Sequence, residues 1–377
     1  MKIVIAPDSF KESLSAMEVA EAIETGLKKV LPDAEYVKVP MADGGEGTVH
    51  SLIDASQGCL KTVAVTAPLG NKVQAQFGIS GDGKTAIIEM AAASGLHLVS
   101  PERRNPLLTT SFGTGELILS ALDEGVQKII LGIGGSATND GGAGMLQALG
   151  AHFADGSGNP LGFGGGALAH IEQADFSGLD SRLRDVDFEV ACDVDNPLCG
   201  EKGASAVFGP QKGATAAMVA ELDAALARFA AKVRAATGKN IKDHAGAGAA
   251  GGMGGGLLTL PNVHLRAGAQ IVLEAVGLAR YVKDADLVIT GEGRMDSQSA
   301  HGKTPIGVAQ VAKQYGKPVI AIVGCLREDY EVVYAHGIDA VFPIIRQLGS
   351  LETVLANARD NLISTAQNVA RLYRLGR

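Results

Sequence analysis

The chain has 377 residues and a formal net charge of −8 at pH 7, and aromatic residues make up only 4% of it. Few aromatic surfaces are therefore present on which bases could stack, and the acidic balance disfavours nucleic acid and anionic membranes as partners. No apolar run approaches the ~20 residues of a membrane span, and the start MKIVIA lacks a signal-peptide pattern. The four cysteines form no CxxC pair, and the histidines form no HExxH motif. We therefore expect a cytoplasmic protein with reduced thiols and no zinc site.

The amino-terminal segment predicts a strand, a helix and a second strand. The β-branched run at residues 2–7 is typical of a buried strand. Ser15 and Glu18 form a capping box, and apolar residues then recur at helical spacing as far as Pro32. Residues 36–41 (YVKVPM) predict the second strand, which leads into the glycine-rich ADGGEGT. This order is typical of an alternating α/β fold.

The middle of the chain has a different rhythm. Three strand-like runs between residues 60 and 91 are separated by the turn signals PLGN and SGDGK, which predicts an antiparallel meander. Helices are expected at 114–124 and 215–236, and a strand is expected at 187–194. Residues 245–256 (AGAGAAGGMGGG) favour a flexible linker over a hinge or a site of close backbone packing.

The last third of the chain returns to alternating helices and strands and ends in a long amphipathic helix. The expected elements before that helix are helix 268–280, strand 285–291, helix 302–315, strand 317–324 and strand 339–345. Such alternation predicts a doubly wound parallel sheet. Because the same pattern opens the chain, we expect one α/β domain formed by residues 1–61 and 263–377, with a mixed, strand-rich α/β domain at 62–262 inserted in it. Ligands are then expected at the carboxyl ends of strands, near the domain junction.

Several predicted strands run out into loops rich in glycine and carboxylates. Glycine lets the backbone come close to an anion, and carboxylates can hold Mg²⁺ or act as bases. The loops are APDSFKESL (6–14), ADGGEGT (42–48), GIGGSATNDGG (132–142), CDVDNPLCG (192–200), FGPQKGA (208–214) and ITGEGRMD (289–296). Their number predicts an active site assembled from several loops.

Two known nucleotide-binding fingerprints, the dinucleotide GxGxxG/A pattern and the Walker A pattern, are each matched in part by this chain. Gly132 to Ala137 satisfies GxGxxA, and Asp155 follows at a suitable distance, but AHFADGSGNP is a poor βα unit and disfavours a dinucleotide site. The Walker A pattern fails, because Ser297 stands where it requires the glycine five residues before Gly302. Phosphate held together with a metal ion is the better interpretation.

The loop at 132–142 is the strongest candidate for a phosphate site. Amides and hydroxyls that could surround an anion belong to Gly134, Gly135, Ser136 and Thr138. The following Asn139 and Asp140 could reach Mg²⁺ or cap the next helix.

Charged residues near other strand ends are further candidates. The lysines placed for a phosphate or carboxylate are Lys11, Lys212 and Lys303, and the carboxylates are Asp8, Asp43, Asp193 and Asp296. Glu292 and Arg294 in GEGR could divide their roles between a metal ion and phosphate. Each of these residues could instead be a turn, cap or surface residue.

Eight motifs in order resemble the bacterial glycerate kinase family, of type 1 and the glycerate 2-kinase branch. They are APDSFKESLSA, PMADGGEGT, TTSFGTGELILSAL, GIGGSATNDGGAGML, ACDVDNPLCG, VFGPQKGA, GAAGGMGGG and ADLVITGEGRMDSQSAHGKTP. The resemblance covers essentially the whole chain. A small departure is Glu12, in a loop where the family commonly has glycine.

The resemblance implies a discontinuous flavodoxin-like (Rossmann-like) domain around an inserted domain. It also implies ATP-dependent phosphorylation of D-glycerate to 2-phosphoglycerate, with Mg²⁺, in the cleft between the two domains. An aspartate would be the general base, either Asp193 or Asp296. The metal candidates are Asp43, Glu292 and Asp193. The catalytic and substrate-binding candidates beside the two bases are Asp8, Ser9, Lys11, Asp43 and Arg294. The ATP-binding candidates are Gly134, Gly135, Ser136, Ala137, Thr138, Asn139 and Lys212.

Three alternatives stay open at this level. The product could carry its phosphate on the 3-hydroxyl. The GxGxxA match could belong to an NAD(P)-dependent hydroxy-acid oxidoreductase. The chain could also be a non-enzymatic binding protein for a small anion, although dense carboxylates speak against it. The sequence leaves the oligomeric state open.

Overall fold

The structure is a computed structural model that describes residues 1–42, 47–300 and 303–375. It forms two compact units. The terminal unit comprises Met1–Asp43, His50–Ser56 and Ala269–Arg377, and the central unit comprises Gly44–Val49 and Gln57–Gly268. The division into domains 1–61 with 263–377 and 62–262 stays a prediction. No helix in the described ranges is long and apolar enough to cross a membrane.

The terminal unit is built on a five-stranded, fully parallel sheet. Its strands in spatial order are β15 (Ala340–Pro343), β13 (Val319–Val323), β11 (Leu287–Thr290), β1 (Lys2–Ile5) and β2 (Glu35–Lys38). Numbered along the chain within this unit, the order is 2-1-3-4-5, which is the flavodoxin-like order. The fold class predicted from the sequence is therefore confirmed for this unit.

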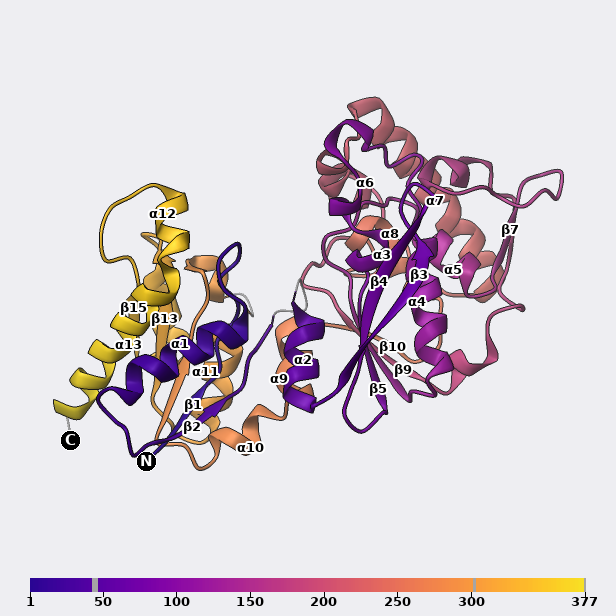
Figure 1. Ribbon diagram of the computed structural model, residues 1–377. Coiled ribbons are helices and arrows are strands. Elements are labelled where there is room, and N and C mark those ends of the chain that lie inside the picture. The colour runs from indigo at the N-terminus through magenta and orange to yellow at the C-terminus, as the bar shows by residue number, and fades with distance from the viewer. Residues whose placement is uncertain (43–46, 301–302, 376–377) are drawn as a thin grey trace. The chain divides into compact units, whose positions relative to one another are not determined.

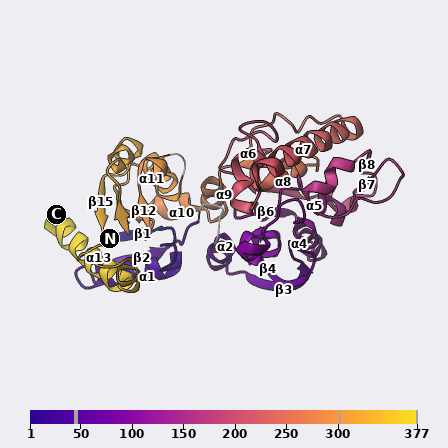
Figure 2. The same cartoon turned by 90° about the horizontal axis from the view of Figure 1, so that it is seen from above.

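Helices cover both faces of this sheet, as Figures 1 and 2 show. On one face α1 (Ala16–Lys28) packs against α13 (Ala358–Leu375), and on the other lies α11 (Thr304–Gln314). The capping box is present: the Ser15 side chain accepts from the Glu18 amide, and the Glu18 carboxylate accepts from the Ser15 amide at 2.8 Å. Burial of the apolar stripe of α1 between α13 and the sheet fixes this helix.

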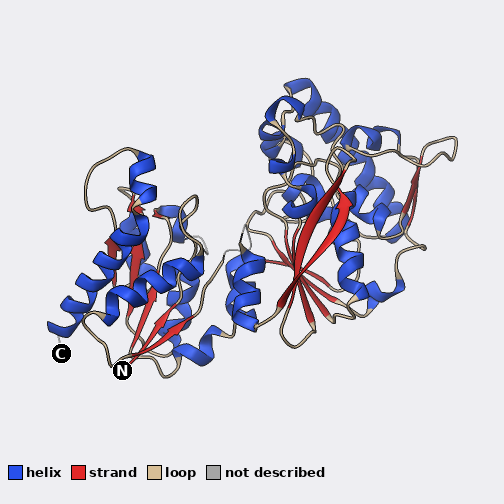
Figure 3. Cartoon of the chain, in the orientation of Figure 1, coloured by secondary structure: helices blue, strands red, loops and turns tan. Residues whose placement is uncertain are grey.

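The central unit has a mixed, six-stranded sheet with helices around it (Figure 3). Its strands in spatial order are β10 (Val263–Arg266), β9 (Asp187–Ala191), β6 (Lys128–Gly132), β5 (Thr85–Glu89), β4 (Lys72–Ile79) and β3 (Cys59–Thr66). β3, β4 and β5 form the predicted antiparallel meander, and β5, β6, β9 and β10 run parallel. The carboxyl ends of these four strands therefore meet at one edge of the sheet.

The two helices predicted for the central unit are present with small changes in their bounds. They are α4 (Phe112–Asp123) and α7 (Ala216–Thr237). On α7, Leu222, Leu226, Phe229 and Val233 recur at helical spacing and are buried. Helix α6 (Ala204–Phe208) packs against both α7 and α8 (Ala249–Leu257), and Figure 2 shows the three together.

The prediction of a flexible linker at 245–256 was wrong. Residues 249–257 form α8, which is almost fully buried, with left-handed backbone at residues 250–252. At Gly251, φ is +68°, and an added Cβ would lie 1.9 Å from the Thr138 carbonyl oxygen. These glycines let two backbones pass each other closely, which is the alternative that composition had ranked second.

Two other expected helices are interrupted. The helix expected at 268–280 is divided into α9 (Gly268–Ala275) and α10 (Leu278–Val282), because Gly277 adopts left-handed backbone with φ +63°. The long helix at the carboxyl end is preceded by a separate short helix, α12 (Leu351–Ala356), which ends at Asn357. The structure also contains elements that were not expected from the sequence. They are the hairpin of β7 (His152–Ala154) with β8 (Gln173–Asp175), and the edge strand β10.

Candidate active-site loops

In the terminal unit the strand order reverses between β1 and β11, and the loops after these two strands lie side by side. The amide of Asp8, after β1, donates to the carbonyl of Gly291, after β11, at 2.8 Å. An added Cβ on Gly293 would lie 3.5 Å from the Lys11 amide nitrogen. Ligands of open α/β sheets bind at such a switch point. The candidates Asp8, Lys11 and Glu292 thus share one edge of one sheet.

The Asp8 carboxylate is fixed from two directions. One oxygen accepts from the Thr304 hydroxyl at 2.9 Å, and the other accepts from the amide of Ser9 at 2.6 Å. Thr304 is the first residue of α11 and is fully buried, so the start of this helix lies beside Asp8. Ser9 is half-buried and Lys11 is exposed in the same loop.

Glu292 is a buried carboxylate among other charges. It is 8% exposed, accepts from the Ser299 hydroxyl at 2.5 Å, and lies 3.7 Å from the Lys303 ammonium. Burial raises the pKa of Glu292 to about 7; Ser299 and Lys303 oppose this, whereas the charges of Asp8 and Asp296 add to it. A carboxyl that titrates near neutral pH in a sheet-edge loop is a functional-site candidate.

Asp296 and Arg294 form an ion pair in the following turn. The Asp296 carboxylate is 3.3 Å from Arg294 Nε and also accepts from the Gln298 amide at 3.0 Å. Asp296 is 2% exposed, whereas the Arg294 side chain is 56% exposed. The guanidinium is thus held near the carboxylate but remains accessible to an anion.

Of the three predicted metal ligands, the structure places only Glu292 among these loops of the terminal unit. Asp43 lies outside the described residues, and Asp193 belongs to the other unit. Within the described residues, no three His, Cys, Asp or Glu side chains converge as a metal site. Mg²⁺ does not require such a cage, because it commonly takes one or two carboxylates and completes its shell with phosphate and water.

In the central unit, the loop of residues 133–142 follows β6, and we name it the β6 loop. Gly134 and Gly135 are exposed at its tip, and Ser136 is 7% exposed. In the described ranges, no acceptor is found for the amides of these three residues. They form the accessible part of the predicted phosphate site.

The second half of the β6 loop is buried and held by long-range hydrogen bonds. Thr138 and Asn139 are 0% exposed and Ala137 is 2% exposed. The Thr109 hydroxyl donates to the Ala137 carbonyl at 2.8 Å, the Lys212 ammonium to the Thr138 carbonyl at 2.6 Å, and the Asn139 amide group to the Ser205 hydroxyl at 2.9 Å. Direct contact of Ala137, Thr138, Asn139 and Lys212 with ATP stays a prediction.

Asp140 takes the capping role that the sequence left open. Its carboxylate is fully buried and accepts from the Ser111 amide and hydroxyl, both at 2.8 Å, and from the amides of Gly142 and Gly144. Ser111 precedes α4, and Gly142 precedes α5 (Ala143–Ala148), so one carboxylate serves the starts of two helices. Burial nevertheless raises the pKa of Asp140, against these hydrogen bonds.

Asp193 follows β9 at the same sheet edge as the β6 loop. It is exposed and accepts from the Gly268 amide at 2.9 Å. This bond joins the loop after β9 to the first residue of α9, which follows β10. Asp193 is therefore positioned by the backbone of a neighbouring element at the same sheet edge.

The dinucleotide fingerprint lacks its second half. Asp155 follows β7, which is antiparallel to β8, and its carboxylate accepts from the amides of Ser157 and Asn159 and from the Asn159 side chain, in its own exposed turn. It does not lie at the end of a second parallel strand, where it would reach a ribose. The GxGxxA match therefore does not describe a dinucleotide site.

Several polar partners of these residues were not found from the sequence. They are Thr304 on Asp8, Ser299 on Glu292, and Ser111 and Ser205 on the β6 loop. Thr304 could have been suspected from the sequence, because it follows Gly302 and Lys303 and completes a GKT tripeptide like the end of a Walker A motif. The others carry no local pattern, since their partners are 7 to 66 residues away in the chain.

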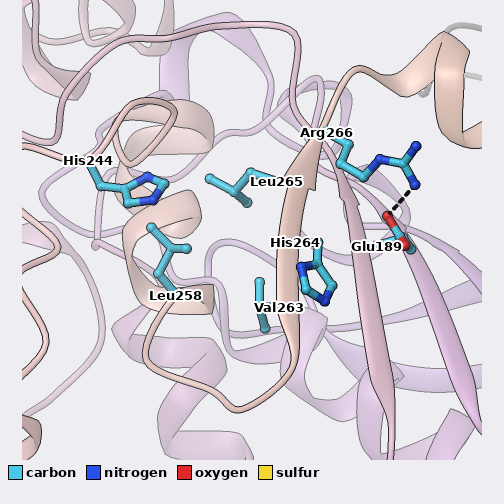
Figure 4. A pocket seen from close by; sticks show the side chains of 7 residues that line it. All are labelled: Glu189, His244, Leu258, Val263, His264, Leu265 and Arg266. Carbon is cyan, nitrogen blue, oxygen red and sulfur yellow. Dashed lines mark hydrogen bonds and ion pairs between the residues drawn. The ribbon is translucent and has the colours of Figure 1, made fainter.

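A separate pocket runs along the edge strand β10 (Figure 4). Val263 and Leu265 lie on the side of Leu258, whereas Arg266 points to Glu189 of β9, with 3.2 Å between their charged groups. His244 and His264 complete its lining. None of the candidate residues lines this pocket, so it gives no support to the candidate site.

Comparison with known proteins gives full-length matches. The family model described as "Glycerate kinase family" matches residues 3–374. A protein of Haemophilus influenzae named glycerate kinase is 71% identical over 99% of this chain and 98% of its own length. A protein of Escherichia coli named glycerate 2-kinase is 58% identical over 100% of this chain and 99% of its own. A crystal structure from Salmonella typhimurium LT2, provisionally assigned as glycerate kinase 2, has a TM-score of 0.92 and 56% identity and covers 100% of this chain and 99% of that one.

Proposed function

Because the chain belongs to the glycerate kinase family, we propose that it transfers the γ-phosphoryl group of ATP to the 2-hydroxyl of D-glycerate. The chain is an enzyme, a glycerate kinase. The observation that carries the choice of hydroxyl is its 58% identity, from end to end, to a protein named glycerate 2-kinase. A cytoplasmic location stays a prediction. All four cysteines are unpaired thiols in the structure.

We assign the phosphates of ATP to the central unit. The exposed residues Gly134 and Gly135 and the neighbouring Ser136, which is 7% exposed, follow the carboxyl end of a parallel strand, where backbone N–H groups can offset negative charge.

We assign glycerate to the terminal unit. Arg294 and Lys11 present accessible positive charge in adjoining loops, which suits the carboxylate of the substrate or the transferring phosphoryl group. Asp8 and Ser9 offer an acceptor and a donor for its hydroxyl groups.

The reaction needs a base at the attacking oxygen. The 2-hydroxyl oxygen forms a bond to phosphorus, the bond from phosphorus to the ADP oxygen breaks, and the hydroxyl proton passes to an aspartate. Asp193 and Asp296 are the candidates, each held by a backbone amide. Fixed cationic groups offset the charge that develops on the phosphoryl oxygens.

Mg²⁺ fits the donor set of the terminal unit. Carboxylate oxygens are its preferred protein ligands, and Asp8 is near enough to Glu292 for its charge to raise the pKa of Glu292. We propose Glu292 and Asp8 as the residues that hold it; Asp43 and Asp193 stay predicted ligands. Bound Mg²⁺ would supply charge neutralisation for the phosphates.

The activity is expected in a simple assay. Purified protein with D-glycerate and ATP·Mg²⁺ should release ADP, and the phosphorus signal of the product should be split by one proton, because C2 bears a single hydrogen. Splitting by two protons would place the phosphate on the 3-hydroxyl instead. Reduction of NAD⁺ by glycerate without ADP release would reject the proposed reaction.

Glu292 is expected to make stability depend on pH. Its pKa is ordinary in the unfolded chain, about 4.3, and about 7 in the folded protein. Between these values the folded protein keeps a proton that the unfolded chain has released. The free energy of unfolding should therefore fall as pH rises from about 4.3 to about 7, by about 4 kcal/mol in all, and then level off.

Urea unfolding between pH 5 and about 8, without divalent metal, tests this dependence. Glu292→Gln should remove the fall, whereas the control Glu331→Gln, at an exposed glutamate of the same unit, should retain it. If Glu292 holds Mg²⁺, added Mg²⁺ should reduce the fall of the free energy of unfolding with pH in wild type. Glu292→Gln should not respond to the metal in this way. Parallel profiles for wild type and Glu292→Gln would contradict the buried environment of Glu292.

A further inference from the structure

Lys212 lies beneath the β6 loop, not at its surface. It ends a short 3₁₀ turn, Pro210–Lys212, and is 1% exposed. Its ammonium donates to the Thr138 carbonyl at 2.6 Å. A lysine that bound phosphate directly in this arrangement would need access to solvent, which Lys212 does not have.

The carbonyl that Lys212 binds is tightly enclosed. The backbone of Gly251 passes so close that an added Cβ would lie 1.9 Å from the same oxygen. Three residues further along the β6 loop, the Gly141 amide donates to the Gly251 carbonyl at 3.0 Å. The Thr138 carbonyl therefore accepts from the buried Lys212 ammonium. The close backbone of Gly251 leaves no room for a water molecule beside it.

The amides of Gly134, Gly135 and Ser136 are two to four residues from this fixed carbonyl. The other hydrogen bonds of residues 134–139 are those of the Leu96 amide to the Gly135 carbonyl, of Ala137 to Ser94 and Thr109, and of Asn139 to Ser205. These are bonds between neutral groups, whereas the bond from Lys212 is charge-assisted, and so stronger and shorter, while its amine is protonated. Loss of the Lys212 bond would leave a buried carbonyl without its donor, and the loop would have to move to satisfy it.

We propose that Lys212 is a positioning residue, which fixes the Thr138 carbonyl so that the amides of Gly134–Ser136 are held ready for the phosphates of ATP. This inference rests on the assignment of ATP phosphates to the β6 loop. Burial lowers the pKa of Lys212 to about 7, and the charge of Asp140 opposes this. The amine can donate to the carbonyl in either protonation state.

Lys239 offers a matched control. It is a lysine of the central unit that, unlike Lys212, is exposed, and its ammonium donates to the carbonyls of Leu258, Thr259 and Leu260 at 2.9 to 3.1 Å. None of these groups belongs to the β6 loop. Lys212→Met and Lys239→Met therefore remove the same kind of bond from two different places.

Two readouts on folded protein test the proposal. In amide hydrogen exchange without ligand, peptides covering residues 133–141 should exchange faster in Lys212→Met than in wild type, and should be unchanged in Lys239→Met. In steady-state kinetics, Lys212→Met should raise the KM for ATP about ten-fold or more, and should leave the KM for glycerate within about two-fold. Lys212→Gln, which keeps an N–H donor, should recover part of both effects.

Each other result overturns the inference. Unchanged exchange with a raised KM for ATP would make Lys212 a direct ligand, and faster exchange with an unchanged KM would make its role purely structural. If Lys212→Met does not fold, the same comparison between Lys212→Gln and Lys239→Gln decides. Wild-type protein that releases no ADP from ATP and glycerate would instead reject the proposed function, while the exchange result would still report on the loop.

Discussion

Replacing the general base by asparagine is expected to lower kcat about 100- to 10,000-fold. The change keeps the size of the side chain, but an amide cannot accept the proton of the attacking hydroxyl. Asp193→Asn and Asp296→Asn should be compared in the ADP-release assay. At least one of them should show this loss, with KM values for ATP and glycerate changed much less.

The surroundings of the two aspartates make the comparison informative. Asp193 is exposed, so its replacement should leave the free energy of unfolding within about 0.5 kcal/mol of wild type. Asp296 is 2% exposed and paired with Arg294, so Asp296→Asn should also destabilise the protein. Thermal unfolding of each variant separates the two effects.

Matched controls are available in the same loops. Asp195→Asn changes an exposed carboxylate two residues after Asp193, and Asp329→Asn changes the exposed partner of the Ser297 hydroxyl, next to Asp296. Both should keep near-normal turnover. If Asp193→Asn and Asp296→Asn also keep it, neither aspartate is the base.

Asp140→Ala is expected to lower the free energy of unfolding by about 3 kcal/mol or more. Four donors lose their acceptor: the amide and hydroxyl of Ser111 and the amides of Gly142 and Gly144. Asp140 is fully buried, so water cannot replace the carboxylate without a change in the fold. The starts of α4 and α5 should be weakened together.

Asp155→Ala is the control for burial. Asp155 also accepts several hydrogen bonds, from the amides of Ser157 and Asn159 and the side chain of Asn159, but it lies in an exposed turn. Its loss should cost about 1 kcal/mol, because water can solvate the donors it leaves. Chemical unfolding of both variants measures the difference. Similar losses would show that burial does not decide the contribution of Asp140.

Some of the candidate site could be identified from local sequence. Asp8, Glu292 and Asp296 were singled out because they follow predicted strands of an alternating α/β pattern, and the structure places all three at one sheet edge. The same reasoning found the β6 loop. It could not tell which part of that loop is accessible: Gly134 and Gly135 are exposed, whereas Thr138 and Asn139 are buried.

The glycine-rich segment at 245–256 shows where composition misleads. A flexible linker and a close contact between two backbones both favour glycine, because glycine has no side chain. The two cases therefore cannot be told apart from composition. Gly251 is needed because the Thr138 carbonyl lies against it, and that carbonyl belongs to a loop more than 100 residues earlier in the chain. No local pattern records such a contact.

Local sequence patterns are enough to predict the strand and helix alternation, the antiparallel meander, the capping box of α1 and the family, because each depends on periodicity or on motifs of consecutive residues. Which polar groups become buried partners depends on how the chain folds: Lys212 lies beneath the Thr138 carbonyl, Asp140 between two helix starts, and Glu292 among Ser299, Lys303 and two carboxylates. These roles follow from burial and from charges brought together by the fold. Burial changes what a lysine or a carboxylate can do, and it is a property of packing that no single stretch of sequence contains.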